Sequence, residues 1–253
     1  MSLLEVRQLN KRFGGLIVTR DVSLTLHKGD RVALIGPNGA GKTTFVNLVT
    51  GHVRPDAGSV SLDGEDVTRW SPTRRVRGGL VRSFQVTRLF SDMTPEEHVA
   101  LALLQRLGRS GRLFADFRTM PDVVREAEEI LVLFNLNGIA RVPVGAIAYG
   151  QQRLLEVALV MALRPKVLLL DEPAAGVPSA DIALIERALA QLPADLAVLM
   201  IDHDMDFVFR FARKVIVLAA GGVIFDGTPE AVTTNADVRQ AYLGSYADDR
   251  SVA

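Results

Sequence analysis

Length, composition and charge limit what this chain can be. It has 253 residues, 48% of them hydrophobic, and it carries 29 basic and 29 acidic side chains. This is enough apolar material for one large core, or for a main domain with a smaller lobe packed on it. A net charge of zero argues against a nucleic-acid-binding protein, which usually has a strong basic excess. The absence of cysteine excludes disulfides, thiolate metal sites and cysteine nucleophiles, and is compatible with a reducing cytoplasm.

The N-terminus and the apolar runs predict a water-soluble chain. Residues 1–5 lack the basic and then apolar run of a signal peptide. The longest apolar stretches, such as residues 196–201, are far too short to span a bilayer. We therefore expect any link to a membrane to go through a partner.

Hydrophobic patterning predicts an α/β fold when the chain is taken in order. Residues 3–9 and 22–26 alternate apolar and polar side chains, which predicts strands near a sheet edge. Residues 31–35 read as a buried strand and residues 167–170 as a central parallel strand. Further strands are expected at 59–62, at 80–84, at 197–201, and at 214–218 and 223–225, the last two joined as a hairpin by a Gly-Gly turn.

Helical periodicity predicts the remaining elements. A helix is expected from about residue 44, closed by Thr50 and Gly51. The other expected helices cover residues 95–107, 121–134, 151–163 and 179–192, with two short ones in 229–243.

Residues 86–165 therefore predict a helical lobe inserted into a core. That core is made of residues 1–85 and 166–253, within a single domain that spans 1–253. The basic segment 108–112 inside the lobe is expected to be solvated, or to touch a partner or lipid headgroups.

Residues 36–44 are the stretch on which the functional interpretation depends. Their sequence fits the phosphate-binding pattern G-x-x-x-x-G-K-S/T between a predicted strand and a predicted helix. Glycines let the backbone wrap close to an anion, and the helix N-terminus aims N–H groups at phosphates. Lys42 would reach the β- and γ-phosphates, and the Thr43 hydroxyl would hold Mg²⁺. The residues expected to bind here are Gly36, Asn38, Gly39, Ala40, Gly41, Lys42, Thr43 and Thr44. The alternative is a glycine-rich turn with a chance Lys-Thr pair.

Two acidic residues, Asp171 and Glu172, end the apolar strand predicted at 167–170. The Asp171 carboxylate would hold Mg²⁺, usually through water. Glu172 would act as a general base that orients and deprotonates an attacking water. Strands often end in two acids, but an apolar strand that does so downstream of a phosphate loop is much rarer by chance.

Three further side chains are candidates from their positions after strands or in a turn. Gln85 follows an apolar strand, where its amide could contact Mg²⁺ and the attacking water. His203, alone among the four histidines, directly follows a core strand, where it could contact the γ-phosphate or lie in an ordinary surface turn. Phe13 could stack on an adenine ring or act as a hydrophobic plug at a strand end, and the sequence leaves both open.

Residues 148–152, Ala-Tyr-Gly-Gln-Gln, begin a strongly periodic helix. The glycine and the amide groups at the helix N-terminus predict a second anion site, and its residues would be Tyr149, Gly150 and Gln151. One chain already has a complete phosphate cradle, so a second favours a two-chain arrangement. Each nucleotide would then lie between the loop of one chain and this helix of another. An ordinary capped helix is the alternative.

In this order, the candidate residues resemble the ATP-binding subunit of ABC transporters over nearly the whole chain. They look like that family's A-loop, Walker A, Q-loop, signature, Walker B and switch histidine: Phe13, 36–44, Gln85, 149–152, 168–172 and His203. The resemblance implies a P-loop NTPase core with an antiparallel β subdomain and an inserted helical lobe. It also implies ATP as substrate and Mg²⁺ as cofactor.

The resemblance is closer to one branch, the ATPases of branched-chain amino acid importers. The stretches that look like this branch are 12–16, 83–90, 148–153, 171–176 and 242–244. This implies a second ATPase chain, itself or a paralogue, two membrane permeases and, indirectly, a periplasmic solute-binding protein as partners, and no nucleic acid. The location implied is the cytoplasmic face of the inner membrane.

Several positions depart from the family pattern. Ala148 stands where the signature usually has Ser, so a hydroxyl contact to the γ-phosphate is missing, and Tyr149 replaces its first Gly, a form familiar in this branch. Pro178 stands at a usually polar D-loop position, with Asp181 as a candidate substitute, and Leu159 replaces a usual Arg. The hydrolytic set is intact: Lys42, Thr43, Gln85, Asp171, Glu172 and His203.

The resemblance thus implies the ATPase of an importer for branched-chain or other hydrophobic amino acids. Alternatives are import of urea, amides or aromatic acids, lipopolysaccharide export, and a regulatory ABC module without transport. The transported solute and the turnover rate are not encoded in any motif of this chain.

Overall fold

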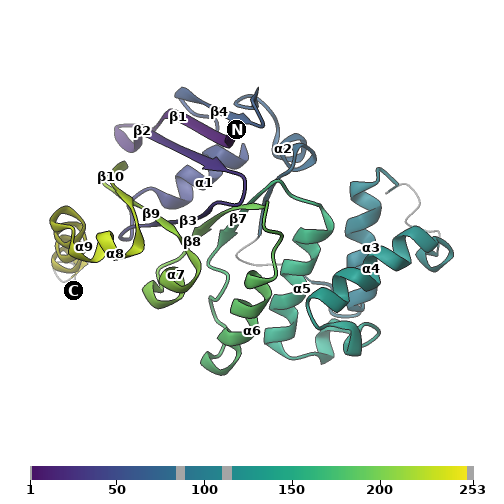
Figure 1. Cartoon of the computed structure of the whole chain (residues 1–253). Helices are drawn as coiled ribbons and strands as arrows, with labels where there is room; N and C mark the ends of the chain where they lie inside the picture. The colour runs from purple at the N-terminus through teal and green to yellow at the C-terminus, as the bar shows by residue number, and fades with distance from the viewer. Residues whose placement is uncertain (1, 84–88, 110–115, 250–253) are drawn as a thin grey trace. The chain divides into compact units, whose positions relative to one another are not determined.

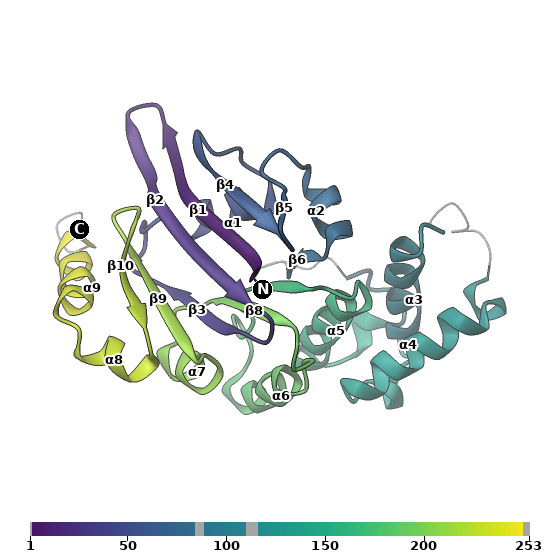
Figure 2. The ribbon, with the colours of Figure 1, turned by 45° about the horizontal axis from the view of Figure 1, so that its top comes forward.

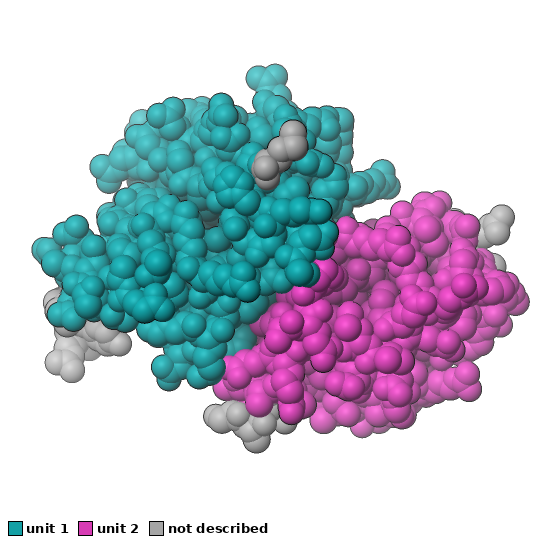
Figure 3. Space-filling model, in the orientation of Figure 1, with its two compact units in different colours: residues 1–82, 166–172, 194–253 teal, residues 83–165, 173–193 magenta. Residues whose placement is uncertain are grey.

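The chain folds into two compact units in the computed structural model, which describes residues 2–83, 89–109 and 116–249. The sheet unit comprises residues 1–82, 166–172 and 194–253, and the helical unit comprises 83–165 and 173–193 (Figure 3). The segment 173–193 groups with the helical unit, although it follows a strand of the sheet unit. Among the described residues, no helix is both long and apolar enough to cross a membrane.

A six-stranded sheet forms the centre of the sheet unit (Figure 1). Its strands lie in the order β10-β9-β3-β8-β7-β6, and all pair in parallel except β10, which forms a hairpin with β9. The strands are β3 (Arg31–Ile35), β6 (Leu80–Arg82), β7 (Val167–Asp171), β8 (Ala197–Ile201), β9 (Lys214–Ala219) and β10 (Gly222–Gly227). The apolar runs of β7 and β8 are buried throughout, as expected for parallel strands covered on both faces.

The register of these strands brings the carboxyl ends of the neighbouring parallel strands to the same end of the sheet. Asp171, the last residue of β7, pairs with Ile201 at the end of β8, and Ile35 at the end of β3 pairs with Val217 of β9. The carboxyl ends of neighbouring parallel strands therefore lie together, which is where open α/β sheets place their ligands.

A second, antiparallel sheet has the strand order β2-β1-β4-β5 (Figure 2). Its strands are β1 (Ser2–Phe13), β2 (Leu16–His27), β4 (Ala57–Leu62) and β5 (Glu65–Asp66). The predicted alternation is confirmed for residues 22–26 of β2, where Val22, Leu24 and Leu26 are buried, and for Leu4 and Val6 of β1, but a register shift between Val6 and Leu9 interrupts it in β1. Of these two strands, β2 lies at an edge of the sheet and β1 does not, since β1 pairs with β2 on one side and with β4 on the other.

Helix α1 (Lys42–Thr50) shares one hydrophobic core with both sheets. Phe45 and Leu48 of α1 join the same buried cluster as Leu4 of β1 and Leu34 of β3. A second cluster lies on the other side of the six-stranded sheet, where α7 (Met205–Phe211), α8 (Pro229–Thr234) and α9 (Ala236–Asp249) contribute Val208, Val232 and Val238. Helix α1 is therefore fixed from two sheets at once.

The helical unit contains α3 (Pro95–Arg106), α4 (Pro121–Leu133), α5 (Tyr149–Ala162) and α6 (Ser179–Ala190). Their bounds confirm the predicted helices to within two residues. Arg106 of α3 ties three helices together: its two terminal nitrogens each lie 2.7 Å from the Glu126 carboxylate of α4, and one donates to the Ala162 carbonyl of α5.

Helix α2 (Pro72–Gly78) was not predicted, because its short basic sequence has no apolar repeat. Its Arg75 is almost fully buried and closes the C-terminal end of α1, donating to the carbonyls of Leu48, Val49 and Thr68. Burial lowers the pKa of Arg75 to about 10, while Asp66 opposes the shift. The guanidinium thus adds a donor to carbonyls in the last turn of α1, where Leu48 also accepts the N–H of Gly51.

Replacing Arg75 by methionine should destabilise the sheet unit by about 2–4 kcal/mol, because it leaves buried carbonyls without a donor. Arg74→Met is the matched control: Arg74 lies on the same helix with its guanidinium over the Trp70 ring, and its loss should cost about 1 kcal/mol or less. Urea unfolding of the two variants measures both values. Equal losses would contradict the role given to Arg75.

Candidate functional site

The loop between β3 and α1 has a backbone that only glycine adopts easily. Gly36, Gly39 and Gly41 have φ values of +152°, +76° and +99°. A Cβ on Gly36 would lie 2.1 Å from the Leu218 carbonyl oxygen, and one on Gly41 would lie 2.5 Å from that of Val18. The loop is therefore pressed against β9 and β2, and neither glycine can be replaced without moving backbone.

The N-terminus of α1 is open to an anion. Gly41 caps the helix without any side-chain hydrogen bond, and the first turn carries no acidic residue. Asn38 and Gly39 at the tip of the loop and Thr43 on the first turn are exposed, while Ala40 is buried and Thr44 is half-buried. Backbone N–H groups and the helix dipole there favour negative charge such as phosphate.

The side chain of Lys42 folds back onto the loop that precedes it. Its Nζ donates to the carbonyl of Gly36 at 2.5 Å and to that of Pro37 at 3.0 Å. Burial lowers the pKa of Lys42, and the negative charges of Glu172 and Asp171 oppose the shift. The ammonium is thus held at the mouth of the loop, close to both strand-end acids.

Asp171 ends β7 almost fully buried, with its Oδ2 in an ion pair with Arg82. The other terminal nitrogen of Arg82 donates to Asn47 Oδ1 of α1 at 2.8 Å. Arg82 lies at the end of β6, which pairs in parallel with β7. Arg82 is not among the predicted site residues. A charged residue at the end of an apolar strand is the feature of the sequence that could have indicated it.

Glu172 leaves the sheet at a left-handed backbone position. Its φ is +48°, and its N–H donates to the Ile201 carbonyl at 2.8 Å, which fixes the turn that begins here. The Glu172 carboxylate is partly exposed, and its Oε1 lies 3.5 Å from Nδ1 of His203, whose side chain is 74% exposed. The structure therefore brings the predicted base and the predicted switch histidine together.

A turn held by Asp202 positions His203. Asp202 Oδ1 accepts the N–H of His203 at 2.7 Å and that of Asp204 at 3.0 Å. Asp202 Oδ2 is buried and has no hydrogen-bond partner among the described residues. Asp204 in turn caps α7 by accepting the Phe207 N–H at 3.0 Å.

Phe13 lies at the tip of the β1–β2 hairpin and is 50% exposed, so it does not plug a strand end. The Lys11 ammonium lies 5.4 Å from the centre of its ring. Phe13 pairs with Leu16 of β2. Two residues further along β2, the carbonyl of Val18 lies against Gly41 of the phosphate loop. The hairpin that carries Phe13 is thus attached to the loop.

The second predicted anion site lies at the start of α5, in the helical unit. Ala148 precedes the helix, and its N–H donates to Gln151 Oε1 at 3.1 Å. Tyr149 is 43% exposed, with the Arg153 guanidinium 5.2 Å from its ring centre. Arg153 also donates to the Ala175 carbonyl, which attaches α5 to the segment that follows Glu172. Gly150 is buried.

Two predicted positions cannot be placed. Gln85 lies outside the described residues, and so does the side chain of Asp181. Pro178 directly precedes α6 and offers that helix no side-chain cap.

The described residues contain no group of three or more His, Asp or Glu side chains suited to hold a metal. The donors near the loop are instead the Thr43 hydroxyl and the Asp171 carboxylate, which are hard oxygen ligands. Mg²⁺ typically binds one or two such groups together with substrate phosphates and waters. The residues present therefore fit a magnesium ion that arrives with a phosphorylated ligand.

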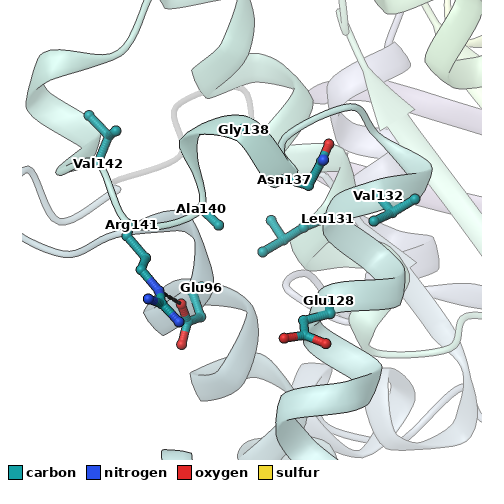
Figure 4. A pocket seen from close by; sticks show the side chains of 9 residues that line it. All are labelled: Glu96, Glu128, Leu131, Val132, Asn137, Gly138, Ala140, Arg141 and Val142. Carbon is teal, nitrogen blue, oxygen red and sulfur yellow. Dashed lines mark hydrogen bonds and ion pairs between the residues drawn. The ribbon is translucent and has the colours of Figure 1, made fainter.

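A separate cavity of about 520 Å³ lies within the helical unit (Figure 4). It is lined by Glu96, Glu128, Leu131, Val132, Asn137, Gly138, Ala140, Arg141 and Val142. Glu96 lies on its wall, where the Arg141 Nε donates to it at 3.4 Å. It holds none of the predicted phosphate-binding residues, so it is a feature of the helical unit alone.

Known proteins share both the sequence pattern and the fold. A family model described as ABC transporter matches residues 19–175, and one described as branched-chain amino acid ATP-binding cassette transporter matches residues 223–248. The high-affinity branched-chain amino acid transport ATP-binding protein BraF of Pseudomonas aeruginosa is 39% identical over 249 residues, covering 96% of this chain and 98% of that protein. LivG of Escherichia coli, with the same description, is 37% identical over 251 residues, with coverages of 96% and 98%.

A solved structure resembles the chain along its length. It is the ADP conformation of MJ1267, an ATP-binding cassette of an ABC transporter, with a TM-score of 0.85 and 28% identity. The match covers 96% of this chain and 99% of that one. The predicted P-loop NTPase fold of the ABC type is therefore confirmed.

The pair between Arg82 and Asp171 should contribute a coupling energy of about 1–3 kcal/mol to folding. A double-mutant cycle with Arg82→Met, Asp171→Asn and the combined variant, followed by urea unfolding, isolates it. Asn47→Ala in the Arg82→Met background separates the second contact of Arg82. A coupling energy indistinguishable from zero would contradict this ion pair.

Asp202 should make stability depend on pH. Burial raises the pKa of Asp202, while the N–H groups of Asp204 and His203 oppose the shift. The folded chain therefore keeps this proton to a higher pH than the unfolded chain does, so the contribution of Asp202 is largest below the ordinary carboxyl pKa and is lost as the pH rises. The stability of Asp202→Asn relative to wild type should rise between about pH 4 and about pH 7. A difference that does not change with pH would contradict this.

Proposed function

The chain belongs to the ABC transporter family of ATP-hydrolysing subunits, and from this membership we propose how its residues drive import of branched-chain or other hydrophobic amino acids. The observation that carries the proposal is the phosphate loop with Lys42 at its mouth and the acids Asp171 and Glu172 beside it. The match of residues 223–248 to a branched-chain amino acid transporter model supports the solute class.

The loop would hold the phosphates of ATP. Backbone N–H groups from Asn38 to Thr44 would surround them, Lys42 would exchange its loop carbonyls for β- and γ-phosphate oxygens, and Phe13 would stack on the adenine. Thr43, Asp171 and Gln85 would hold Mg²⁺. When bound, that ion would neutralise charge on the phosphate oxygens.

Glu172 would act as the general base. Its carboxylate would accept a proton from a water whose oxygen attacks the γ-phosphorus, while the bond from that phosphorus to the bridging oxygen breaks to leave ADP. His203 lies beside Glu172 on an exposed turn, where it would contact the γ-phosphate, and Gln85 would orient the water. The ADP and phosphate carry away the negative charge that Lys42 neutralised.

A second ATPase chain would complete each site. Tyr149, Gly150 and Gln151 at the start of α5 would contact the nucleotide held by the other chain. The exposed Tyr149 ring and the backbone there, without a hydroxyl at Ala148, would make that contact. Dimer closure on ATP and opening after hydrolysis would move two permeases through the helical unit, at the cytoplasmic face of the membrane. A solute-binding protein would deliver the amino acid to the permeases.

Glu172→Gln should bind ATP with nearly wild-type affinity and hydrolyse it about 10²- to 10⁴-fold more slowly, because the amide cannot accept the proton. Glu186→Gln, a change on α6, serves as the control and should leave turnover unchanged. ATP binding by calorimetry and phosphate release measure the two quantities. Wild-type turnover by Glu172→Gln would show that Glu172 is not the base.

The import role is tested by what co-purifies with the tagged chain from its native membranes in mild detergent. Two multi-span permeases, a further ATPase chain and an amino-acid-binding protein are expected. Lipid-export membrane proteins would instead favour lipopolysaccharide export, and soluble partners alone would favour a regulatory module.

A further inference from the structure

Arg82 joins the two elements that carry Asp171 and Thr43, two of the expected magnesium ligands. One terminal nitrogen of Arg82 forms an ion pair with Oδ2 of Asp171 at the end of β7, and the other donates to Oδ1 of Asn47 in α1 at 2.8 Å. Asn47 lies four residues after Thr43, so the two side chains share one face of α1, one turn apart. The guanidinium therefore lies beside Asp171 and about one helical turn from Thr43.

The ion pair between Arg82 and Asp171 is shielded from water. The two side chains are only 16% and 9% exposed. Opposite charges in such a place interact more strongly than at the surface, because solvent and salt screen them less. The described part of the chain offers Arg82 no second ion pair, and the Arg82 Nε is buried there without a hydrogen-bond partner. The charge of Arg82 is therefore directed at Asp171.

A fixed cation beside a metal ligand opposes the binding of a free metal ion. Mg²⁺ and the Arg82 guanidinium are both attracted to the Asp171 carboxylate, and they repel each other. A divalent ion without nucleotide would meet this repulsion with few protein ligands to offset it, since Mg²⁺ sites of this kind depend on substrate phosphates. The same ion bound to ATP arrives with the negative charge of the phosphates, which Arg82 attracts.

We propose that Arg82 is an internal counter-ion: it neutralises Asp171 in the absence of nucleotide and makes metal binding at Asp171 depend on ATP. This rests on the proposed roles of Thr43 and Asp171 in holding Mg²⁺. Arg82 acts through Asp171 and Asn47, so it is a positioning residue and not a metal ligand. The chain then binds the metal together with ATP and only weakly without it.

Arg82→Gln tests this, because glutamine keeps a hydrogen-bond donor but carries no charge. Mn²⁺, a paramagnetic substitute for Mg²⁺, is titrated alone into the nucleotide-free full-length chain, and the loss of the free Mn²⁺ EPR signal measures binding. Arg82→Gln should bind Mn²⁺ about 10-fold more tightly than wild type, since a repelling charge is removed. Arg82→Lys keeps the charge and should bind Mn²⁺ as wild type does.

Two controls assign the gain to the Asp171 carboxylate. Adding Asp171→Asn to Arg82→Gln should remove the gain, because the carboxylate that would receive the metal is lost. Arg106→Gln breaks an ion pair of similar burial, that with Glu126 in the helical unit, and should leave Mn²⁺ binding unchanged. Thermal unfolding establishes that each variant is folded, and Arg82→Met, which is also uncharged, gives the same comparison if Arg82→Gln does not fold.

Mn²⁺ binding by the uncharged variant that equals or is weaker than that of wild type would overturn the proposal. So would a gain that Arg82→Lys or Arg106→Gln shares, or one that survives Asp171→Asn. The proposed function is checked separately, by equilibrium dialysis of wild type against Mn²⁺ and ATP. If wild type retains no Mn²⁺ under those conditions, the proposed function itself fails.

Discussion

The structure depends on the close approach of backbone to backbone around the phosphate loop. The carbonyls of Leu218 and Val18 occupy the space that side chains at Gly36 and Gly41 would need. Because β9 and β2 belong to different sheets, the loop is clamped between them, and the shared core of α1 fixes its other end. The anion-binding N–H groups are thus held in place by the scaffold, which lowers the entropy lost when a ligand binds.

The acidic residues depend on a different constraint, the register of parallel strands. Asp171 and Ile201 are paired, so Glu172 and Asp202 leave the sheet side by side and His203 lies within 3.5 Å of the Glu172 carboxylate. The buried Asp171 lies beside the cation of Arg82, and the negative charges of both acids oppose the lowering of the Lys42 pKa by burial. Charge is therefore balanced around the site before any ligand charge is added, which limits the cost of burying an acid there.

Most elements and the central motifs could be predicted from the sequence. Strands β3, β7 and β8 are predicted by their apolar runs. The phosphate loop directly follows β3, and the two acids lie at the end of β7. The contacts of Arg82 and Arg75 could not be predicted, because each joins residues that are far apart in the chain: Arg82 and Asp171 are separated by 89 positions. Helix α2 could not be predicted either, because its own sequence has no apolar periodicity. The domain boundaries and the roles of the site residues stay predictions.

The central claim is that the loop of residues 36–44 is the ATP site, and titration of the full-length chain with ATP and Mg²⁺ in a calorimeter tests it most directly. Wild type should bind one ATP per chain, and Lys42→Ala should weaken binding about 10- to 100-fold, since a charged hydrogen-bond donor to the phosphates is lost. Lys28→Ala, which removes an exposed ammonium paired with Asp195, should bind as wild type does. Equal affinities for wild type and Lys42→Ala would contradict the account.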